Sequence, residues 1–77
     1  MTSYTKEDIG QIVELINQKS HLEVRWTSIR NNYYLVKREG NFNRQIIFAK
    51  GISNFYHKLD AIEEFLSEMK RVQEVIA

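Results

Sequence analysis

The two histidines and a series of carboxylates are the residues of this chain whose types are most typical of catalytic or metal sites. His57, Asp60 and Glu64 are spaced i, i+3 and i+7, so a helix places them along one side and can present three metal ligands. The same spacing is typical of a solvated helix start whose acids favour the positive end of the helix dipole. We adopt this second interpretation.

No spaced catalytic motif accompanies these residues. Neither histidine stands in a recognisable motif with a nucleophile, and the sequence lacks a phosphate-cradling glycine loop, the HExxH pattern and the Gly-x-Ser-x-Gly pattern. We therefore expect no catalytic residue, no metal site and no cofactor, and hence a protein that is not an enzyme.

Basic residues gather in the middle of the chain. Residues 21–58 carry seven Lys and Arg against two Glu, whereas residues 59–77 carry two Lys and Arg against five acids. Cations that project from one face of a sheet contact phosphates, and one of the neighbours Lys37 and Arg38 can belong to such a set. An exposed Tyr33 or Tyr34 can stack on a base. Strands are also basic for an ordinary reason, since Lys and Arg discourage edge pairing. The candidate nucleic-acid-binding residues are Arg25, Lys37, Arg38, Arg44, Lys50 and Tyr33.

A second set of candidates fits a protein partner. Phe42 lies in the turn Gly40-Asn41-Phe42-Asn43, whose polar neighbours make burial difficult, so this side chain can anchor a partner. The acids of the last segment repeat at i, i+4, which is typical of a solvated helix face and, in fewer cases, of a docking surface for a basic partner. The candidate partner-binding residues are Phe42, Asp60, Glu64, Glu68, Val72 and Ile76.

Apolar periodicity predicts the elements that position these side chains. Thr5 can cap a first helix, whose apolar stripe runs with helical spacing from Ile9 to Ile16. Alternation of apolar and polar residues from position 21 onwards, with Asn- and Gly-containing turns, predicts three strands. Ser53 or Asn54 can cap a second, longer helix. The expected elements are a helix at about 5–19, strands at about 21–28, 33–39 and 43–50, and a helix at about 55–75.

Short connections make neighbouring strands antiparallel, so the expected fold is α+β, a two-layer helix–strand–strand–strand–helix domain spanning residues 1–77. The strands form a meander, and both helices pack on one face of it. The inward side of the second strand stays open, because Tyr33 with Leu35 and Tyr34 with Val36 are equally apolar. If Tyr34 points inward, Tyr33 lies on the open basic face, and the opposite register buries Tyr33.

The large apolar side chains are expected to fill the core, because a domain of this size needs their area. These are Trp26, Phe48, Phe65 and Met69, together with one of the two adjacent tyrosines. A helix at 55–75 is about 30 Å long, whereas a strand of six or seven residues covers about 20–23 Å. The last two helical turns therefore project beyond the sheet, where Val72 and Ile76 can pair with a second copy in a homodimer.

Composition indicates a soluble chain in a reducing compartment. The sequence has no cysteine, no apolar stretch of the roughly 20 residues that a membrane span needs, and no signal-peptide core among its first residues. We expect a cytoplasmic protein without membrane contact.

The expected element order over residues 5–75 resembles that of double-stranded-RNA-binding domains. Those domains carry a Gly-Pro-x-His loop and a Lys-Lys-x-Ala-Lys helix start. This chain has Ser28-Ile29-Arg30-Asn31-Asn32 and Tyr56-His57-Lys58-Leu59-Asp60 at the two positions. The resemblance therefore implies the element order and not the RNA-binding function.

The chain also resembles small proteins of phages and mobile elements of Gram-positive bacteria. The resemblance rests on the hairpin 31–36, the strand end Phe48-Ala49-Lys50-Gly51 and the acidic helix 61–66. Some type II anti-CRISPR inhibitors share this order and occupy the DNA-binding surface of a nuclease with acidic groups. We interpret the chain as a small non-enzymatic binding protein of this type that contacts nucleic acid through a basic open sheet face. The alternative is a protein–protein module that inhibits a host or defence enzyme through the acidic helix or the hairpin tip.

Overall fold

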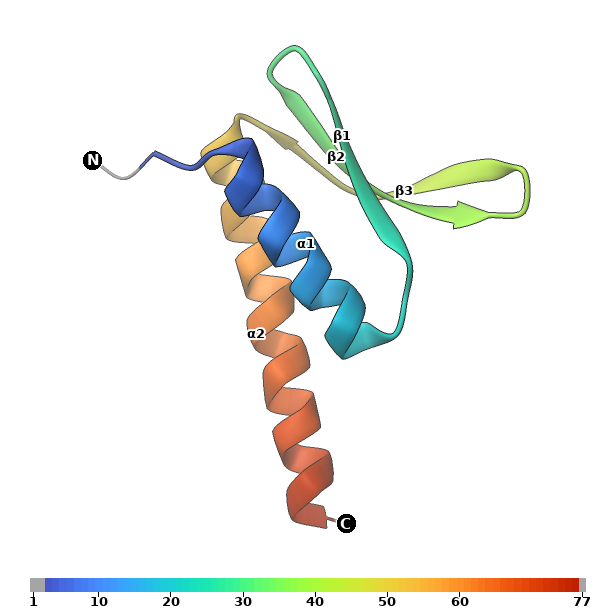
Figure 1. Ribbon diagram of the computed structural model, residues 1–77, viewed down its shortest axis with the longest axis vertical. Helices are drawn as coiled ribbons and strands as arrows, with labels where there is room; N and C mark the ends of the chain where they lie inside the picture. Colours follow the sequence, from blue (N-terminus) through green and yellow to red (C-terminus); the bar gives the residue numbers. More distant parts are fainter. Residues whose placement is uncertain (1–2, 77) are drawn as a thin grey trace.

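A computed structural model describes residues 3–76, with side chains as far as Gln73. The chain forms helix α1 (Lys6–Ser20), strands β1 (Val24–Ile29), β2 (Asn32–Glu39) and β3 (Phe42–Lys50), and helix α2 (Ile52–Ile76). The strands form one antiparallel sheet in the order β1-β2-β3, and both helices pack on the same face of it (Figure 1). The predicted α+β fold and its helix–three-strand–helix order are confirmed.

Helix α1 begins at a capping box. The Thr5 hydroxyl accepts a hydrogen bond from the Asp8 N–H at 3.2 Å, and the Asp8 carboxylate accepts one from the Thr5 N–H at 2.8 Å. Two free donors of the helix start are thereby satisfied. The helix ends at Ser20, and its C-cap His21 donates its N–H to the Asn17 carbonyl at 3.0 Å before the left-handed backbone of His21 (φ 60°) turns the chain away.

Strand β1 begins at Val24 and not at residue 21 as predicted, because His21 belongs to the helix end. Leu22 is therefore not a strand residue and stays exposed. The Asn17 side-chain amide fixes the strand start, since it accepts from the Val24 N–H at 2.7 Å and donates to the Val24 carbonyl at 3.0 Å. Asn17 thus joins α1 to the edge of the sheet.

Helix α2 follows β3 directly. Gly51 has a positive φ of 89°, which a glycine adopts without strain. Its N–H donates to the Asn31 carbonyl at 2.7 Å, and its carbonyl accepts from the Phe55 N–H at 3.1 Å. Because Gly51 turns the chain at once, the predicted caps Ser53 and Asn54 lie inside the first turn, and the prediction of a start near residue 55 was wrong.

The core lies between the two helices and the inner face of the sheet. It consists of Ile9, Ile12, Val13 and Ile16 of α1, Val24, Tyr33, Leu35 and Ala49 of the strands, and Phe55 and Leu59 of α2. Tyr33 is central to it, with its ring centroid 6.3 Å from that of Trp26 and 5.5 Å from that of Phe55. The predicted α1 stripe is confirmed, and Trp26 packs at the margin of the core.

Helix α2 is longer than the layer it covers. Its 25 residues extend about 37 Å, and its second half projects beyond α1 and the sheet (Figure 1). Phe65 and Met69 are for this reason 64% and 46% exposed, so the prediction that they fill the core was wrong. Among the described residues, no helix combines the length and the apolar composition that a membrane span needs.

Candidate nucleic-acid interface

The sheet has one face against the helices and one open face. Directly paired residues of neighbouring strands share a face, so the pairing assigns each side chain to one of the two. The open face carries Arg25, Thr27 and Ile29 of β1, Asn32, Tyr34, Val36 and Arg38 of β2, and Asn43, Gln45, Phe48 and Lys50 of β3. Among these described strand residues there is no carboxylate.

Tyr33 lies on the inner face, and its predicted role as an exposed stacking residue is therefore wrong. It is 7% exposed. The register that the sequence left open buries Tyr33 and Leu35 and places Tyr34 and Val36 on the open face. Phe48, which was expected in the core, pairs with Tyr34 and is 43% exposed.

A β-bulge in β3 separates the predicted basic residues onto two faces. Leu35 pairs with Ile47 and Val36 pairs with Gln45, so Ile46 is an extra residue between them. Residues of β3 before the bulge are thereby shifted to the opposite face from the one that simple alternation gives.

Arg44 consequently lies on the inner face near the β2–β3 turn, opposite Lys37, which the register of β2 places on that face with Leu35. The Glu39 carboxylate lies beside both, with its Oε1 at 3.0 Å from Arg44 Nε and 3.9 Å from Lys37 Nζ. The prediction that Arg44 shares the open face with Arg25 is wrong, and of the alternatives Lys37 and Arg38 it is Arg38 that lies on the open face. The like charges of Lys37 and Arg44 are partly balanced by Glu39.

Tyr34 and Phe48 form an aromatic pair in the middle of the open face. Their ring centroids are 5.3 Å apart and their planes are inclined by 41°. Tyr34 is half-buried and Phe48 is exposed. Ile29 and Ile46 are also exposed large apolar side chains of these strands. Flat aromatic bases stack on such exposed rings.

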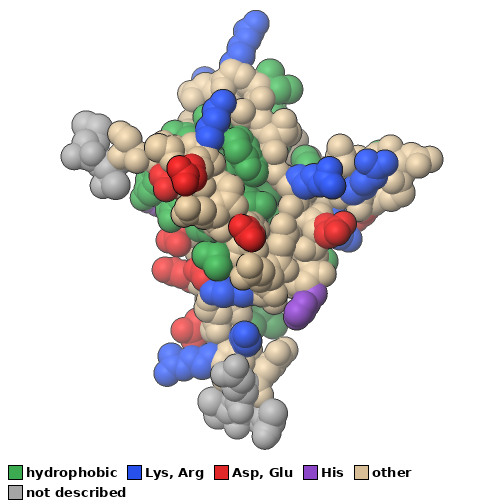
Figure 2. Space-filling view, in the orientation of Figure 1, with side chains coloured by type: hydrophobic (Ala, Val, Ile, Leu, Met, Phe, Trp, Pro, Cys, Tyr) green, Lys and Arg blue, Asp and Glu red, His purple; other side chains and the backbone are tan. Residues whose placement is uncertain are grey.

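Two exposed cations border the aromatic pair, Arg25 of β1 and Lys50 of β3, and the exposed Arg38 lies on the same face farther along β2, toward the β2–β3 turn. Arg38 Nε donates to the Gly40 carbonyl at 3.3 Å, which engages one of its five donors. Figure 2 shows Lys and Arg side chains at both ends of the sheet, whereas Asp and Glu side chains gather mainly along the helices. The strands thus carry mainly cations, whereas the helices carry most of the acids together with cations such as Lys19 and Arg71.

The acidic candidates follow one side of α2. Glu64 and Glu68 are exposed, Asp60 is half-buried, and Glu68 lies 3.9 Å from Arg71. Burial raises the pKa of Tyr56 above its ordinary value, and the charge of Asp60 adds to this rise.

The neighbouring Glu63 ties the two helices together. Its carboxylate accepts hydrogen bonds from the Lys19 ammonium of α1 and from the Ser67 hydroxyl. The bond from Lys19 holds the pKa of Glu63 below its ordinary value of 4.5.

The remaining candidates lie away from the open face. Phe42 is 63% exposed at the β2–β3 turn, and Val72 is 52% exposed on the projecting half of α2. The side chain of Ile76 lies outside the described residues. The structure does not bring Phe42 together with α2, because the hairpin arm and the helix diverge (Figure 1).

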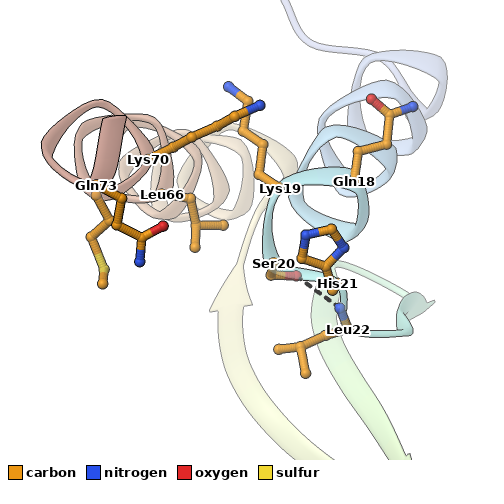
Figure 3. A pocket seen from close by; sticks show the side chains of 9 residues that line it. Gln18, Lys19, Ser20, His21, Leu22, Leu66, Lys70 and Gln73 are labelled. Carbon is orange, nitrogen blue, oxygen red and sulfur yellow. Dashed lines mark hydrogen bonds between the residues drawn. The ribbon is translucent and has the colours of Figure 1, made fainter. Parts of the chain in front are cut away.

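Two further features do not contribute to this interface. One is a hollow between the helices, and the other is His57 of α2. The hollow, of about 550 Å³, lies where α1 ends beside α2, and Leu22, Leu66 and Met69 are its apolar lining (Figure 3). Within the described part of the chain, no three His, Asp or Glu side chains gather closely enough to hold a metal ion.

Comparison with known proteins found no match, either to a family model, to a curated protein or to a solved structure. The resemblances to double-stranded-RNA-binding domains and to phage and mobile-element proteins therefore stay predictions.

Sequence reasoning placed Phe48 in the core and named Tyr34 only as the alternative to Tyr33 for stacking on a base. A two-residue turn at Arg30-Asn31 pairs Ile29 with Asn32, and this pairing sets Thr27 opposite Tyr34. Thr27 shares the polar side of β1 with Arg25, so the turn length was the signal that assigns Tyr34 to the open face.

Proposed function

We propose that this protein binds single-stranded nucleic acid on the open face of its sheet. The observation that carries the proposal is the aromatic pair of Tyr34 and Phe48, which lies between exposed cations on a face whose described strand residues include no carboxylate. Bases stack on aromatic rings, and Arg and Lys neutralise phosphates. In this proposal Tyr34 takes the stacking role that was predicted for Tyr33.

The apolar centre of this face favours a single strand over a duplex. In a duplex the bases are stacked on one another, and a protein reaches only their edges and the phosphates. A face that includes the exposed Ile29 and Phe48 would then lose its contact with water and meet charged phosphates. In a single strand the faces of the bases are available, and each stacked base contributes about 1–3 kcal/mol.

The stacking contribution is tested by fluorescence anisotropy with a labelled single-stranded oligonucleotide. Phe48→Ala is expected to raise the dissociation constant about 5- to 150-fold, which corresponds to the loss of one stacked base. Phe42→Ala is the matched control, because it removes an exposed phenylalanine from the same strand at the hairpin tip. Equal effects of the two substitutions, or no binding by the unaltered protein at low salt, would refute the proposal.

The contribution of the cations is tested with two double variants that remove the same charge. Arg25→Gln with Lys50→Gln alters the open face, and Lys37→Gln with Arg44→Gln alters the inner face. The first variant is expected to weaken binding and to lower the slope of log K against log salt by about 1.4, since each phosphate contact on a single strand contributes about 0.7. The second is expected to leave the slope unchanged, and a reversed order would contradict the assignment of the faces.

A protein–protein module that inhibits a host or defence enzyme is the second candidate. It is favoured by the exposed Phe42 and by the acidic side of α2 that carries Glu64 and Glu68. On this hypothesis Phe42→Ala or Glu64→Lys removes the inhibition of the partner enzyme, and Phe48→Ala leaves it intact. The same three variants therefore separate the two candidates.

A further inference from the structure

The end of the sheet that carries the β2–β3 turn projects away from both helices (Figure 1). Residues 38–43 extend beyond the start of β1, because Val24, the first residue of β1, pairs with Lys37. Residues 42–46 of β3 are all exposed. Residues 37–44, here called the β2–β3 arm, therefore form a ribbon of two strands that projects from the rest of the sheet.

The β2–β3 arm carries cations on both of its faces. Arg38 is exposed and belongs to the open face. Lys37 and Arg44 lie opposite each other on the other face, where the Glu39 carboxylate beside them offsets one of their two charges. Each face of the arm is therefore left with one uncompensated positive charge.

A groove of duplex DNA is a partner that requires cations on both faces of a ribbon. A flat surface would meet only one face of the arm, whereas a groove has a row of phosphates along each of its two walls. The major groove of B-form DNA is about 12 Å wide and about 8.5 Å deep, and it admits a two-stranded ribbon. Three residue pairs and a two-residue turn give the arm a length of about 10 Å, which is enough to reach the floor of this groove.

Phe42 lies where the arm would meet the bases. It belongs to the last residue pair before the turn, opposite Glu39, and is 63% exposed. Apolar side chains in the major groove contact the methyl group of thymine. The end of the arm therefore offers an apolar contact to base edges, while the cations behind it offer contacts to the phosphates.

The β2–β3 arm also continues the open face on which the single strand is proposed to lie. Arg38 follows Tyr34 by four residues along β2, which corresponds to about 14 Å. Phosphates follow one another at about 3.4 Å along each strand of a duplex, so about four nucleotides of similar spacing separate the aromatic pair from the arm. A single strand that leaves the end of a duplex can thus lie on the open face while the arm enters the groove of that duplex.

We propose that this protein recognises the junction between a single strand and a DNA duplex, with the β2–β3 arm in the major groove and Phe42 at the base edges. This inference rests on the proposed binding of a single strand to the open face, and it adds the duplex as the second part of the ligand. An RNA duplex does not offer the same site, because side chains cannot read its deep and narrow major groove.

Fluorescence anisotropy with two DNA probes tests the junction. One probe is a single strand, and the other carries the same strand as an overhang on a hairpin duplex of one helical turn. The unaltered chain is expected to bind the second probe about tenfold more tightly or better, with a slope of log K against log salt that is steeper by about 1.8, since each of two further phosphate contacts contributes about 0.9. Equal affinities would overturn this inference alone, whereas no binding of the single strand would refute the proposed function and the junction with it.

Two exposed phenylalanines give a matched pair of variants, since Phe42 is 63% exposed and Phe65 of α2 is 64% exposed. Phe42→Ala is expected to weaken binding of the junction probe about 5- to 10-fold, through the loss of one partly buried ring, and to leave the single strand unaffected. Phe65→Ala is expected to change neither affinity. If Phe42→Ala leaves the affinity for the junction unchanged, the proposal is wrong, and the ring is left to the protein partner of the second candidate function.

The double variant Lys37→Gln with Arg44→Gln tests the contact with the groove wall. It is expected to lower the salt slope by about 0.9 with the junction probe and to leave the slope unchanged with the single strand. A third probe, in which an RNA hairpin carries the same single-stranded overhang, is expected to bind no more tightly than the single strand alone. A gain as large as that of the DNA hairpin would contradict entry of the arm into the major groove.

Discussion

Replacing each of two adjacent tyrosines by leucine should affect stability very differently. Tyr33 is 7% exposed and its ring contacts those of both Trp26 and Phe55, whereas Tyr34 is half-buried and its ring contacts only that of Phe48 among the aromatic pairs of the described residues. Each aromatic pair contributes about 0.5–1.5 kcal/mol beyond the area that it buries. Tyr33→Leu is therefore expected to lower the free energy of unfolding by about 1–3 kcal/mol, and Tyr34→Leu by less than about 1 kcal/mol.

Urea denaturation followed by fluorescence measures both changes, because the chain has a single tryptophan at position 26. A domain of 77 residues has a total stability of roughly 4–12 kcal/mol, so the larger change should shift the transition midpoint clearly without unfolding the protein. A larger loss for Tyr34→Leu than for Tyr33→Leu would show that the opposite face of β2 is buried, and the assignment of the open face would fail with it.

Three further substitutions test contacts that hold the layers together. Asn17→Ala leaves the N–H and carbonyl of Val24 without their side-chain partner, and urea denaturation should show a loss of about 2 kcal/mol. Glu63→Gln should lower stability by up to about 1 kcal/mol at neutral pH. Because the pKa of Glu63 is held below 4.5 in the folded chain, this difference should be complete above pH 4.5 and vanish as the pH falls through the lowered pKa, and a constant difference would contradict the Lys19 contact. Glu39→Gln leaves Lys37 and Arg44 opposed without an acid, and the melting temperature should fall at low salt and recover at high salt.

The helices were predictable because a single amphipathic pattern determines each of them. Thr5 and the stripe from Ile9 to Ile16 mark both the start and the buried side of α1. The end of α1 was not predictable from alternation, because His21 continues the strand-like pattern of Leu22 and Val24 while its backbone closes the helix.

The faces of the sheet were less predictable than its strands. β2 is apolar on both sides, so only its pairing with β1 through the two-residue turn decides that Tyr33 is buried. In β3, a regular strand places Arg44 on the same face as Phe48, and the bulge at Ile46 reverses this. No residue type near Ile46 marks a bulge in advance, which is why Arg44 fell on the wrong face, whereas the face of Lys37 follows from the register of β2.

The most direct test of the open face as a nucleic-acid interface is an NMR titration of the ¹⁵N-labelled protein with a short single-stranded oligonucleotide at low salt. We expect the largest chemical-shift changes at the amides of Arg25, Tyr34, Phe48 and Lys50, with small changes along α2. Shifts confined to α2 or to the β2–β3 turn, or no shift at saturating oligonucleotide, would contradict the proposed function.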